Sequence, residues 1–177
     1  IMYWEETIEL IKKYGEEPKS TYPHPYSESD DYEVYLYERG TFKTKYIPIE
    51  DFPENIKDNI KKYLKYNLTD FQLFSSLGAS EGFGVHGDPD DVLIICLEGE
   101  ISYIVEKYHG FTTQEDAYIK NDPVILKPGD TIFIQKGLKH MGISSTVPRI
   151  CLSCGGARNV PKEEVTHYFG SGYRTKI

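Results

Sequence analysis

The stretch that decides the fold is Gly82-Phe83-Gly84-Val85-His86-Gly87-Asp88, paired with a later stretch, Leu126-Lys127-Pro128-Gly129-Asp130 and onward to His140. Successive side chains of an extended chain alternate between two faces, so His86 and Asp88 are predicted to point the same way. The later stretch is predicted to run strand, turn, strand and to end near His140. The turn from Gln135 to Lys139 would return the end of that strand to the mouth of the same cavity.

Two imidazoles and one carboxylate form the facial arrangement that holds non-haem Fe(II) and leaves coordination positions open. Each residue alone is weak evidence, because most histidines are structural or exposed and Gly-Asp-Pro is also a good turn. Their order and their strand context favour a metal site formed by His86, Asp88 and His140. The other three histidines lack such neighbours and are interpreted as surface or loop residues: His24, His109 and His167.

The composition is that of one folded domain. Hydrophobic residues make up 39% of the 177 residues and charged residues 27%, which is typical of a globular chain with a real core. A net charge of −8 argues against a general nucleic-acid binder, because phosphate contacts need clustered Lys and Arg. No apolar run reaches the roughly 18 residues of a membrane span, and no signal-peptide pattern opens the chain. We expect a single domain over residues 1–177, without a membrane partner.

The cysteines are too few for a disulfide framework. Cys151 and Cys154 form a Cys-x-x-Cys motif inside an apolar, strand-like run, and no second pair accompanies it. We interpret them, with Cys96, as core or strand cysteines; a zinc or redox role is the alternative. This usage predicts a reducing, cytoplasmic compartment.

Helices are predicted mainly in the first third of the chain. Trp4, Ile8 and Ile11 fall at helical spacing before a possible C-cap at Gly15. A second helix is predicted over 52–65, with Asp51 and Glu54 as its capping box. Its apolar stripe would consist of Phe52, Ile56, Ile60 and Leu64. A loop is predicted over 16–31 and a final helix over 161–169.

Short strands are predicted in the rest of the chain. A hairpin is predicted from 32–38 and 42–49, and a second from 124–126 and 131–134 around a type II Pro-Gly turn. Further strands are predicted at 71–77, 92–97 and 101–108, and the last at 149–153. Seven or eight strands at short spacing predict a mainly β fold, a barrel or jelly roll with N-terminal helical additions.

A family resemblance covers roughly residues 71–155. The segments 86–88, 91–95, 98–99, 126–134 and 137–140 resemble the cupin-type JmjC oxygenases, and they are most similar to the bacterial ribosomal-protein hydroxylase branch. The resemblance implies a double-stranded β-helix fold and an Fe(II)- and 2-oxoglutarate-dependent dioxygenase, with His86, Asp88 and His140 as iron ligands. Protein-hydroxylating members usually carry a further dimerisation and docking domain, which is not expected within these residues. The expected substrate is a small molecule or a protein side chain.

The sequence departs from that family at one important position. Members usually carry a Lys or Arg for the distal carboxylate of 2-oxoglutarate on the strand after the Glu-Gly turn, where this chain has Ile101. Arg149, at the start of the final strand, is interpreted as an inward-facing replacement, because an unpaired carboxylate in a closed barrel is costly. Ser102 or Tyr103 would add a hydroxyl group to this cofactor-binding site.

Two other classes of protein remain open. The first is a cupin metalloenzyme that acts on a small substrate without 2-oxoglutarate, which Ile101 favours and Arg149 opposes. The second is a cupin-like binding module, which a complete His/Asp/His set opposes. Tyrosines in the first loop either line a substrate entrance or, as our default interpretation, pack against the sheet: Tyr22, Tyr26, Tyr32, Tyr35 and Tyr37.

Overall fold

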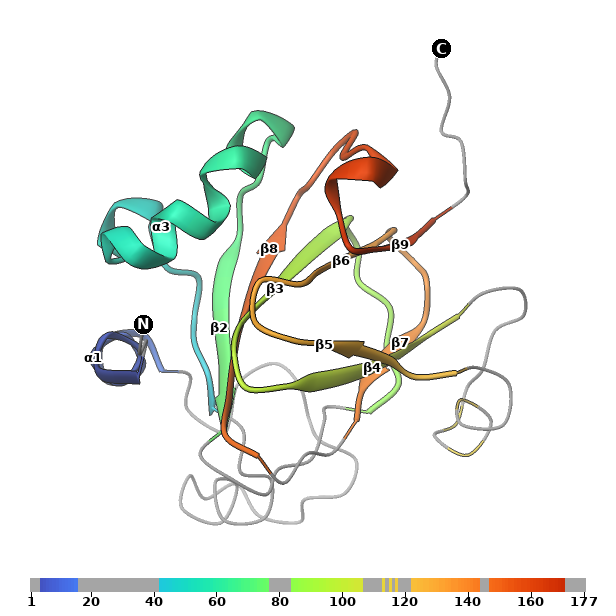
Figure 1. The fold of residues 1–177 in the computed structure, drawn as a ribbon, viewed down its shortest axis with the longest axis horizontal. Coiled ribbons are helices and arrows are strands. Elements are labelled where there is room, and N and C mark those ends of the chain that lie inside the picture. The colour runs from blue at the N-terminus through green and yellow to red at the C-terminus, as the bar shows by residue number, and fades with distance from the viewer. Residues whose placement is uncertain are drawn as a thin grey trace.

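The two stretches that carry the candidate metal ligands lie in a mainly β protein. The computed structural model describes residues 4–15, 42–76, 84–106, 113, 115, 117, 122–143 and 147–170. These residues form two β-sheets, with short helices on one side (Figure 1). No helix in this part of the chain is both long enough and apolar enough to cross a membrane.

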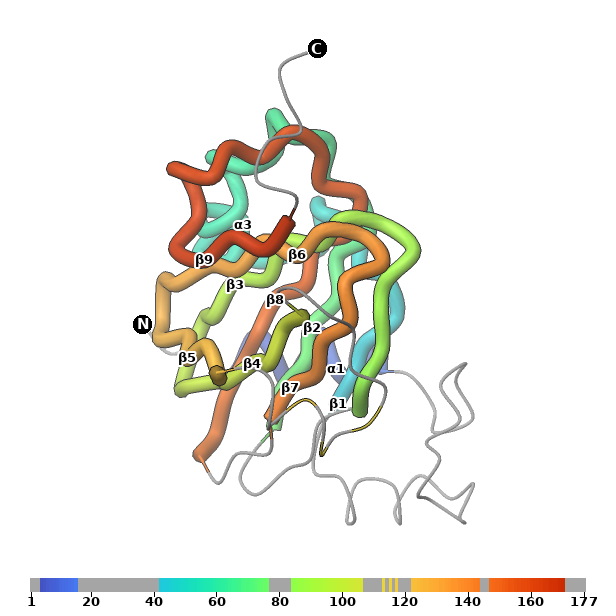
Figure 2. The backbone as a smooth tube through the Cα atoms, turned by 90° about the vertical axis from the view of Figure 1, so that its right-hand side faces the viewer, coloured from blue at the N-terminus to red at the C-terminus, as the bar shows by residue number. Residues whose placement is uncertain are grey.

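Six strands form the larger sheet and three form the smaller sheet. The larger sheet has the order β1 (Phe42–Lys43), β2 (Phe71–Ser76), β8 (Arg149–Gly155), β3 (Val92–Glu98), β6 (Thr131–Ile134) and β9 (His167–Phe169). The smaller sheet has the order β5 (Val124–Leu126), β4 (Ile101–Val105) and β7 (His140–Gly142). Paired strands are antiparallel, except that β9 runs parallel to β6 at the edge of the larger sheet (Figure 2).

The larger sheet separates two apolar layers, which explains the unbroken apolar run of β3. Both faces of a strand in this position are covered, so neither face needs polar residues. One face of β3 packs with the smaller sheet, through Val92, Ile94 and Cys96. The other face packs with the helices, through Leu93, Ile95 and Leu97.

Helices cover the outer face of the larger sheet (Figure 1). The helical segments are α1 (Trp4–Tyr14), the 3₁₀ turn η1 (Ile49–Asp51), α3 (Glu54–Ile60) and the 3₁₀ helix η2 (Lys61–Tyr66). Leu10 of α1 and Ile56 of α3 belong to the same buried cluster as Leu73 of β2. The helices therefore close one layer and leave the interior between the sheets to the strands.

The turn at residues 127–130 connects the two sheets. Asp130 donates its backbone N–H to the Lys127 carbonyl oxygen at 2.8 Å, and Gly129 has a φ of 91°, which confirms the predicted type II turn. The predicted hairpin is wrong, because β5 pairs with β4 whereas β6 pairs with β3. The chain passes between the sheets again from β3 to β4. This alternation confirms the predicted double-stranded β-helix, or jelly-roll barrel, with N-terminal helical additions.

The first predicted helix is confirmed and the second is corrected. Gly15 donates its N–H to the Ile11 carbonyl oxygen at 2.7 Å and ends α1. The capping box is wrong: α3 begins after Pro53 without a side-chain cap, and the Asp51 carboxylate instead accepts from Lys13 at 2.7 Å. After Ile60 the chain continues as a 3₁₀ helix, whose three residues per turn bring Tyr63 inward and leave Leu64 40% exposed.

Two predictions near the end of the chain are wrong. Strand β8 continues to Gly155 and is not the last strand. Residues 161–169 form a short 3₁₀ turn, η3 (Lys162–Glu164), and then β9 instead of a helix. The open edge of β6 accounts for this, because Gln135 donates its N–H to the Phe169 carbonyl oxygen at 2.8 Å, and Tyr168 stacks on Phe133.

Several predictions lie wholly or partly outside the described residues. These are the loop at 16–31, the first arm of the hairpin at 32–38, the five tyrosines of the first loop, His24, His109 and the end of the strand predicted over 101–108. The second arm of that hairpin is reduced to β1, which pairs with β2.

The cysteines are free and buried, as predicted. Cys151 packs between the two sheets, whereas Cys154 packs in the cluster on the helix side of β8. Burial raises the pKa of the Cys154 thiol well above its usual range. The two residues of the Cys-x-x-Cys motif thus face opposite layers, which does not bring their sulfur atoms together for a metal.

Candidate metal centre

A reciprocal pair of backbone hydrogen bonds brings the two predicted histidine ligands together. His86 donates its backbone N–H to the His140 carbonyl oxygen at 3.0 Å, and His140 donates its own to the His86 carbonyl oxygen at 2.8 Å. Gly137, in the turn before β7, also donates its N–H to the Asp88 carbonyl oxygen at 2.9 Å. The turn from Gln135 to Lys139 is therefore fixed against the segment that carries Asp88.

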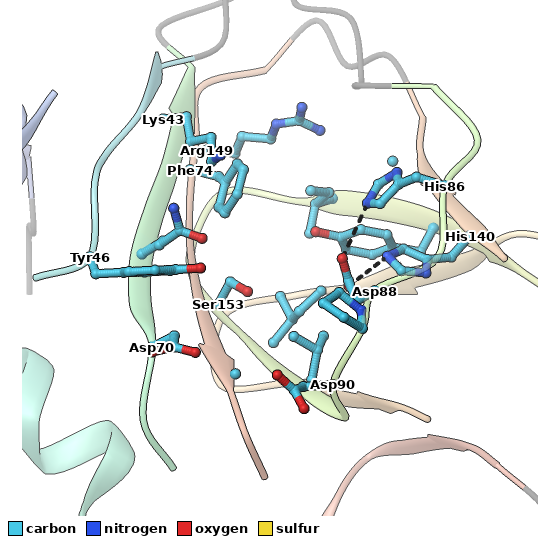
Figure 3. Close-up of a pocket in the computed structure, with 18 residues that line it drawn as sticks. Lys43, Tyr46, Asp70, Phe74, His86, Asp88, Asp90, His140, Arg149 and Ser153 are labelled. Atoms are coloured by element: carbon cyan, nitrogen blue, oxygen red, sulfur yellow. Dashed lines mark ion pairs between the residues drawn. The ribbon is translucent and has the colours of Figure 1, made fainter. Parts of the chain in front are cut away.

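The three predicted ligands meet, with one ligand atom from each within 4.8 Å of the others. The Asp88 carboxylate oxygens lie 3.3 Å from His140 Nε2 and 3.9 Å from His86 Nε2 (Figure 3). His86 Nδ1 lies 3.0 Å from the Gly84 carbonyl oxygen, and His140 Nδ1 lies 3.0 Å from the Leu138 carbonyl oxygen. When Nδ1–H donates to these carbonyls, each Nε2 lone pair is directed at the shared centre, an orientation typical of metal-binding histidines.

The electrostatic surroundings favour the protonation states that bind metals. Burial lowers the pKa of His86, and the nearby His140 lowers it further, so the imidazole of His86 is neutral near pH 7. Burial alone would raise the pKa of Asp88. A hydrogen bond from His140, and electrostatic interactions with His140, His86 and Lys43, each lower the pKa. Together they outweigh the effect of burial, so the pKa of Asp88 is below its usual value. A neutral imidazole and an ionised carboxylate are both ready to coordinate a cation.

The three residues line one end of a cavity of about 210 Å³ between the two sheets. Apolar side chains form part of its walls, including Val92 and Ile94 of β3. Such walls limit water around any bound group and strengthen electrostatic interactions inside the cavity.

Arg149 supplies a buried cation to the same cavity. Its side chain is 4% exposed, and Figure 3 shows it reaching from β8 toward the side where His86 lies. Its guanidinium donates to the Ile143 carbonyl oxygen at 3.3 Å, and no carboxylate of the described residues forms an ion pair with it. A buried Arg without a carboxylate partner is available to pair with an anionic ligand.

The two hydroxyl residues predicted on β4 lie on different faces of the strand. Tyr103 and Ile101 line the cavity, as alternation on one face requires. Burial raises the pKa of Tyr103 well above its usual value, so its O–H stays available as a donor. Ser102 is not among the lining residues, because the residue between two inward-facing positions of a strand points outward. Of the two predicted hydroxyl groups, only that of Tyr103 therefore faces the cavity.

Sequence reasoning missed Lys43 and Phe74, which also line the cavity. They are directly paired on β1 and β2. The alternation of β2 puts Gln72 and Phe74 on one face, but the pairing that adds Lys43 to this face cannot be read from the sequence. The positive charge of Lys43 lowers the pKa of both His86 and Asp88, which places it within electrostatic reach of the site.

The fold and site define a double-stranded β-helix protein with a His/Asp/His group able to hold a metal ion. Residues 45–164 match the family model of the JmjC domain, and the chain belongs to this family.

The solved structures that are similar in fold include two of the same protein. One is YcfD, a ribosomal oxygenase from Escherichia coli, in complex with cobalt and 2-oxoglutarate, with 22% sequence identity and a TM-score of 0.50 over 70% of this chain and 33% of that chain. The other is an X-ray structure of E. coli YcfD, with 20% identity and a TM-score of 0.50 over 70% of this chain and 35% of that chain. The chain therefore spans about a third of the length of the YcfD chain. A search of curated proteins found no match.

Proposed function

We propose that this protein is an Fe(II)- and 2-oxoglutarate-dependent oxygenase that hydroxylates a C–H bond of a small molecule or of a protein side chain. The observation that carries the proposal is the buried Arg149 in the same cavity as His86, Asp88 and His140. Membership of the JmjC family and the likeness to YcfD, whose structure contains cobalt and 2-oxoglutarate, support it.

The donor set fits Fe(II). Two imidazole nitrogens and one carboxylate oxygen are the set that holds non-haem Fe(II) on one face, with the remaining positions open to other ligands. His86, Asp88 and His140 would hold the ion. When bound, Fe(II) supplies the oxidation of a C–H bond by O₂, coupled to the decarboxylation of 2-oxoglutarate to succinate and CO₂.

The residues of this chain would bind and orient the reactants. The Gly84 and Leu138 carbonyl groups hold the two imidazoles in one tautomer and orientation. Arg149 would pair with the distal carboxylate of 2-oxoglutarate, and the neutral Tyr103 hydroxyl would donate to the bound ligand. The apolar walls of the cavity would exclude water until the substrate binds.

One observation favours a second candidate, a cupin metalloenzyme that acts without 2-oxoglutarate. Ile101 lines the cavity from β4 and offers no charge to a dicarboxylate. This candidate shares the metal site with the first, so the binding of 2-oxoglutarate distinguishes the two.

An anaerobic titration tests the proposal without knowledge of the substrate. Fe(II) and 2-oxoglutarate are added to the metal-free protein, and the visible charge-transfer band of an iron-chelated 2-oxo acid is measured. We expect a saturable band of one complex per chain. Tight iron binding by the wild-type protein without any band would contradict the dependence on 2-oxoglutarate and favour the second candidate.

A further inference from the structure

Charged side chains give the two ends of the cavity opposite signs. Lys43 and Arg149 line the upper end in Figure 3, and Asp70 and Asp90 line the lower end, with the metal ligands at a level between them. Lys43 pairs with Phe74 of β2, whereas Asp70 comes four positions earlier, immediately before that strand. Four residues of extended chain separate the two levels by about 13 Å. A ligand that reaches both ends therefore meets cations at one and carboxylates at the other.

The Asp70 carboxylate lies against β8 at the lower end. Its Cβ lies 3.2 Å, and one carboxylate oxygen 3.4 Å, from the point that a Cβ at Gly155 would occupy. Gly155 lines the cavity, so its missing side chain leaves room for this carboxylate. Within the part of the chain that the structure describes, neither Asp70 nor Asp90 forms an ion pair with a cation. This end of the cavity therefore favours a cationic group in a ligand.

Two cations line the opposite end. The proposed function uses Arg149 for the distal carboxylate of 2-oxoglutarate, and Lys43 supplies the second positive charge. Lys43 is half-buried, and its charge lowers the pKa of both His86 and Asp88, so its electric field extends over the metal site. A second anionic group in the cavity would be attracted to this charge.

Apolar side chains line the cavity between its charged ends. They include Phe74 of β2 together with Val92 and Ile94 of β3. Apolar walls with a few polar groups at fixed points are typical of sites for small molecules, in which the walls hold the carbon chain and the polar groups fix its direction. The middle of the cavity therefore fits an aliphatic chain.

We propose that the substrate is a small aliphatic zwitterion, with a carboxylate at Lys43 and an ammonium or guanidinium group at Asp70 and Asp90. The C–H bonds in the middle of its chain would then lie at the level of the metal ligands. This inference rests on the proposed function. It selects a free amino acid with its charges at opposite ends over a protein side chain, because a basic side chain brings no carboxylate to Lys43.

Three probes of equal chain length test the two ends separately. 6-Aminohexanoate carries both charges, hexanoate lacks the ammonium group, and protonated hexylamine lacks the carboxylate. Binding of each probe is measured by isothermal titration calorimetry, with the metal-free full chain and with the chain loaded anaerobically with Fe(II) and 2-oxoglutarate. The variants are Lys43→Met and Asp70→Asn. Lys45→Met and Asp122→Asn are their controls, since both residues are exposed and neither lines the cavity.

We expect the wild type to bind 6-aminohexanoate about tenfold more tightly than either singly charged probe, as for one charge-assisted contact at each end. Lys43→Met should abolish the preference over hexylamine, and Asp70→Asn should reduce the preference over hexanoate. The two control variants should keep both preferences. Hexylamine that binds the wild type as tightly as 6-aminohexanoate would overturn the proposal in favour of a basic protein side chain. An unchanged preference over hexylamine in a folded Lys43→Met protein would also overturn it.

The charge-transfer band distinguishes failure of this inference from failure of the proposed function. A wild-type protein that gives the band with 2-oxoglutarate but shows no preference among the probes would overturn the zwitterion site alone. A wild-type protein without the band that still prefers 6-aminohexanoate in the metal-free state would contradict the use of 2-oxoglutarate and support the zwitterion site. Loss of the band in Lys43→Met, with the preference over hexylamine retained, would assign Lys43 to the cosubstrate instead.

Discussion

Arg149 faces the cavity from β8 of the larger sheet, whereas Ile101 faces it from β4 of the smaller sheet. Family resemblance predicts a cation at the position of Ile101, and this chain has its buried cation on the other sheet. An anionic ligand would therefore lie against the larger sheet, with its metal-binding end at His86, Asp88 and His140.

The affinity for 2-oxoglutarate should depend on Arg149. We expect Arg149→Gln to weaken binding by about 1.5–3 kcal/mol, because it removes the charge-assisted hydrogen bonds to the distal carboxylate while keeping most of the side-chain volume. The measurement is the anaerobic titration of the charge-transfer band. Arg158→Gln is the control, since Arg158 is exposed and is not among the residues that line the cavity. Equal affinities of the two variants would contradict the role of Arg149.

Metal binding should depend on Asp88 and His140 but not on His167. Each Ala substitution in the first pair removes a ligand, so we expect the affinity for Fe(II) to fall by more than the roughly 10–100-fold typical of losing an outer hydrogen-bond partner. His167 lies on β9, outside the cavity lining. The measurement is the iron content of each variant after equilibrium dialysis. A His140→Ala protein that keeps one iron per chain would exclude the assigned site.

The meeting of His86, Asp88 and His140 was predictable from the sequence because it depends on local rules. Alternation along an extended chain relates His86 to Asp88, and the Pro-Gly turn indicates that the chain reverses before His140. Alternation also excludes Ser102, since Tyr103 occupies the inward position of β4. The prediction named Ser102 and Tyr103 as alternatives, and the structure shows that Tyr103 is the one that lines the cavity.

Long-range pairing was not predictable. Two strands that flank a tight turn are expected to pair, but β5 pairs with β4 and β6 pairs with β3, so the two strands join different sheets. The same holds for residues 161–169, whose apolar positions fit a helix until the open edge of β6 is considered. The pairing of Ser76 with Arg149 also depends on register, which the sequence of β2 does not specify.

The change from α3 to a 3₁₀ helix has a measurable consequence for stability. Ile60 is fully buried and Leu64 is 40% exposed, although an unbroken α-helix would place both on one face. We expect Ile60→Ala to lower the free energy of unfolding by roughly 2–5 kcal/mol, because it leaves a cavity in the core. Leu64→Ala should cost less than about 1 kcal/mol. Urea denaturation compares the two, and equal losses would show that the helix continues regularly in solution.

Two glycines with positive φ angles separate backbone strain from steric contact. Gly129, with φ of 91°, has no heavy atom within 4 Å of the position that an alanine Cβ would take, so Gly129→Ala should cost only the left-handed strain of about 1–2 kcal/mol. Gly99, with φ of 72°, would bring the same methyl group to 2.0 Å from the Pro148 carbonyl oxygen and 2.9 Å from the Arg149 Cα. Gly99→Ala must therefore displace the start of β8.

We expect Gly99→Ala to lose more stability than Gly129→Ala in urea denaturation, by at least about 2 kcal/mol, as backbone overpacking adds to strain. Because the displaced segment carries Arg149, a folded Gly99→Ala protein should also bind 2-oxoglutarate more weakly, while Gly129→Ala binds it as the wild type does. The same charge-transfer titration measures this. Wild-type affinity in a destabilised Gly99→Ala protein would mean that the anion site does not depend on the position of β8.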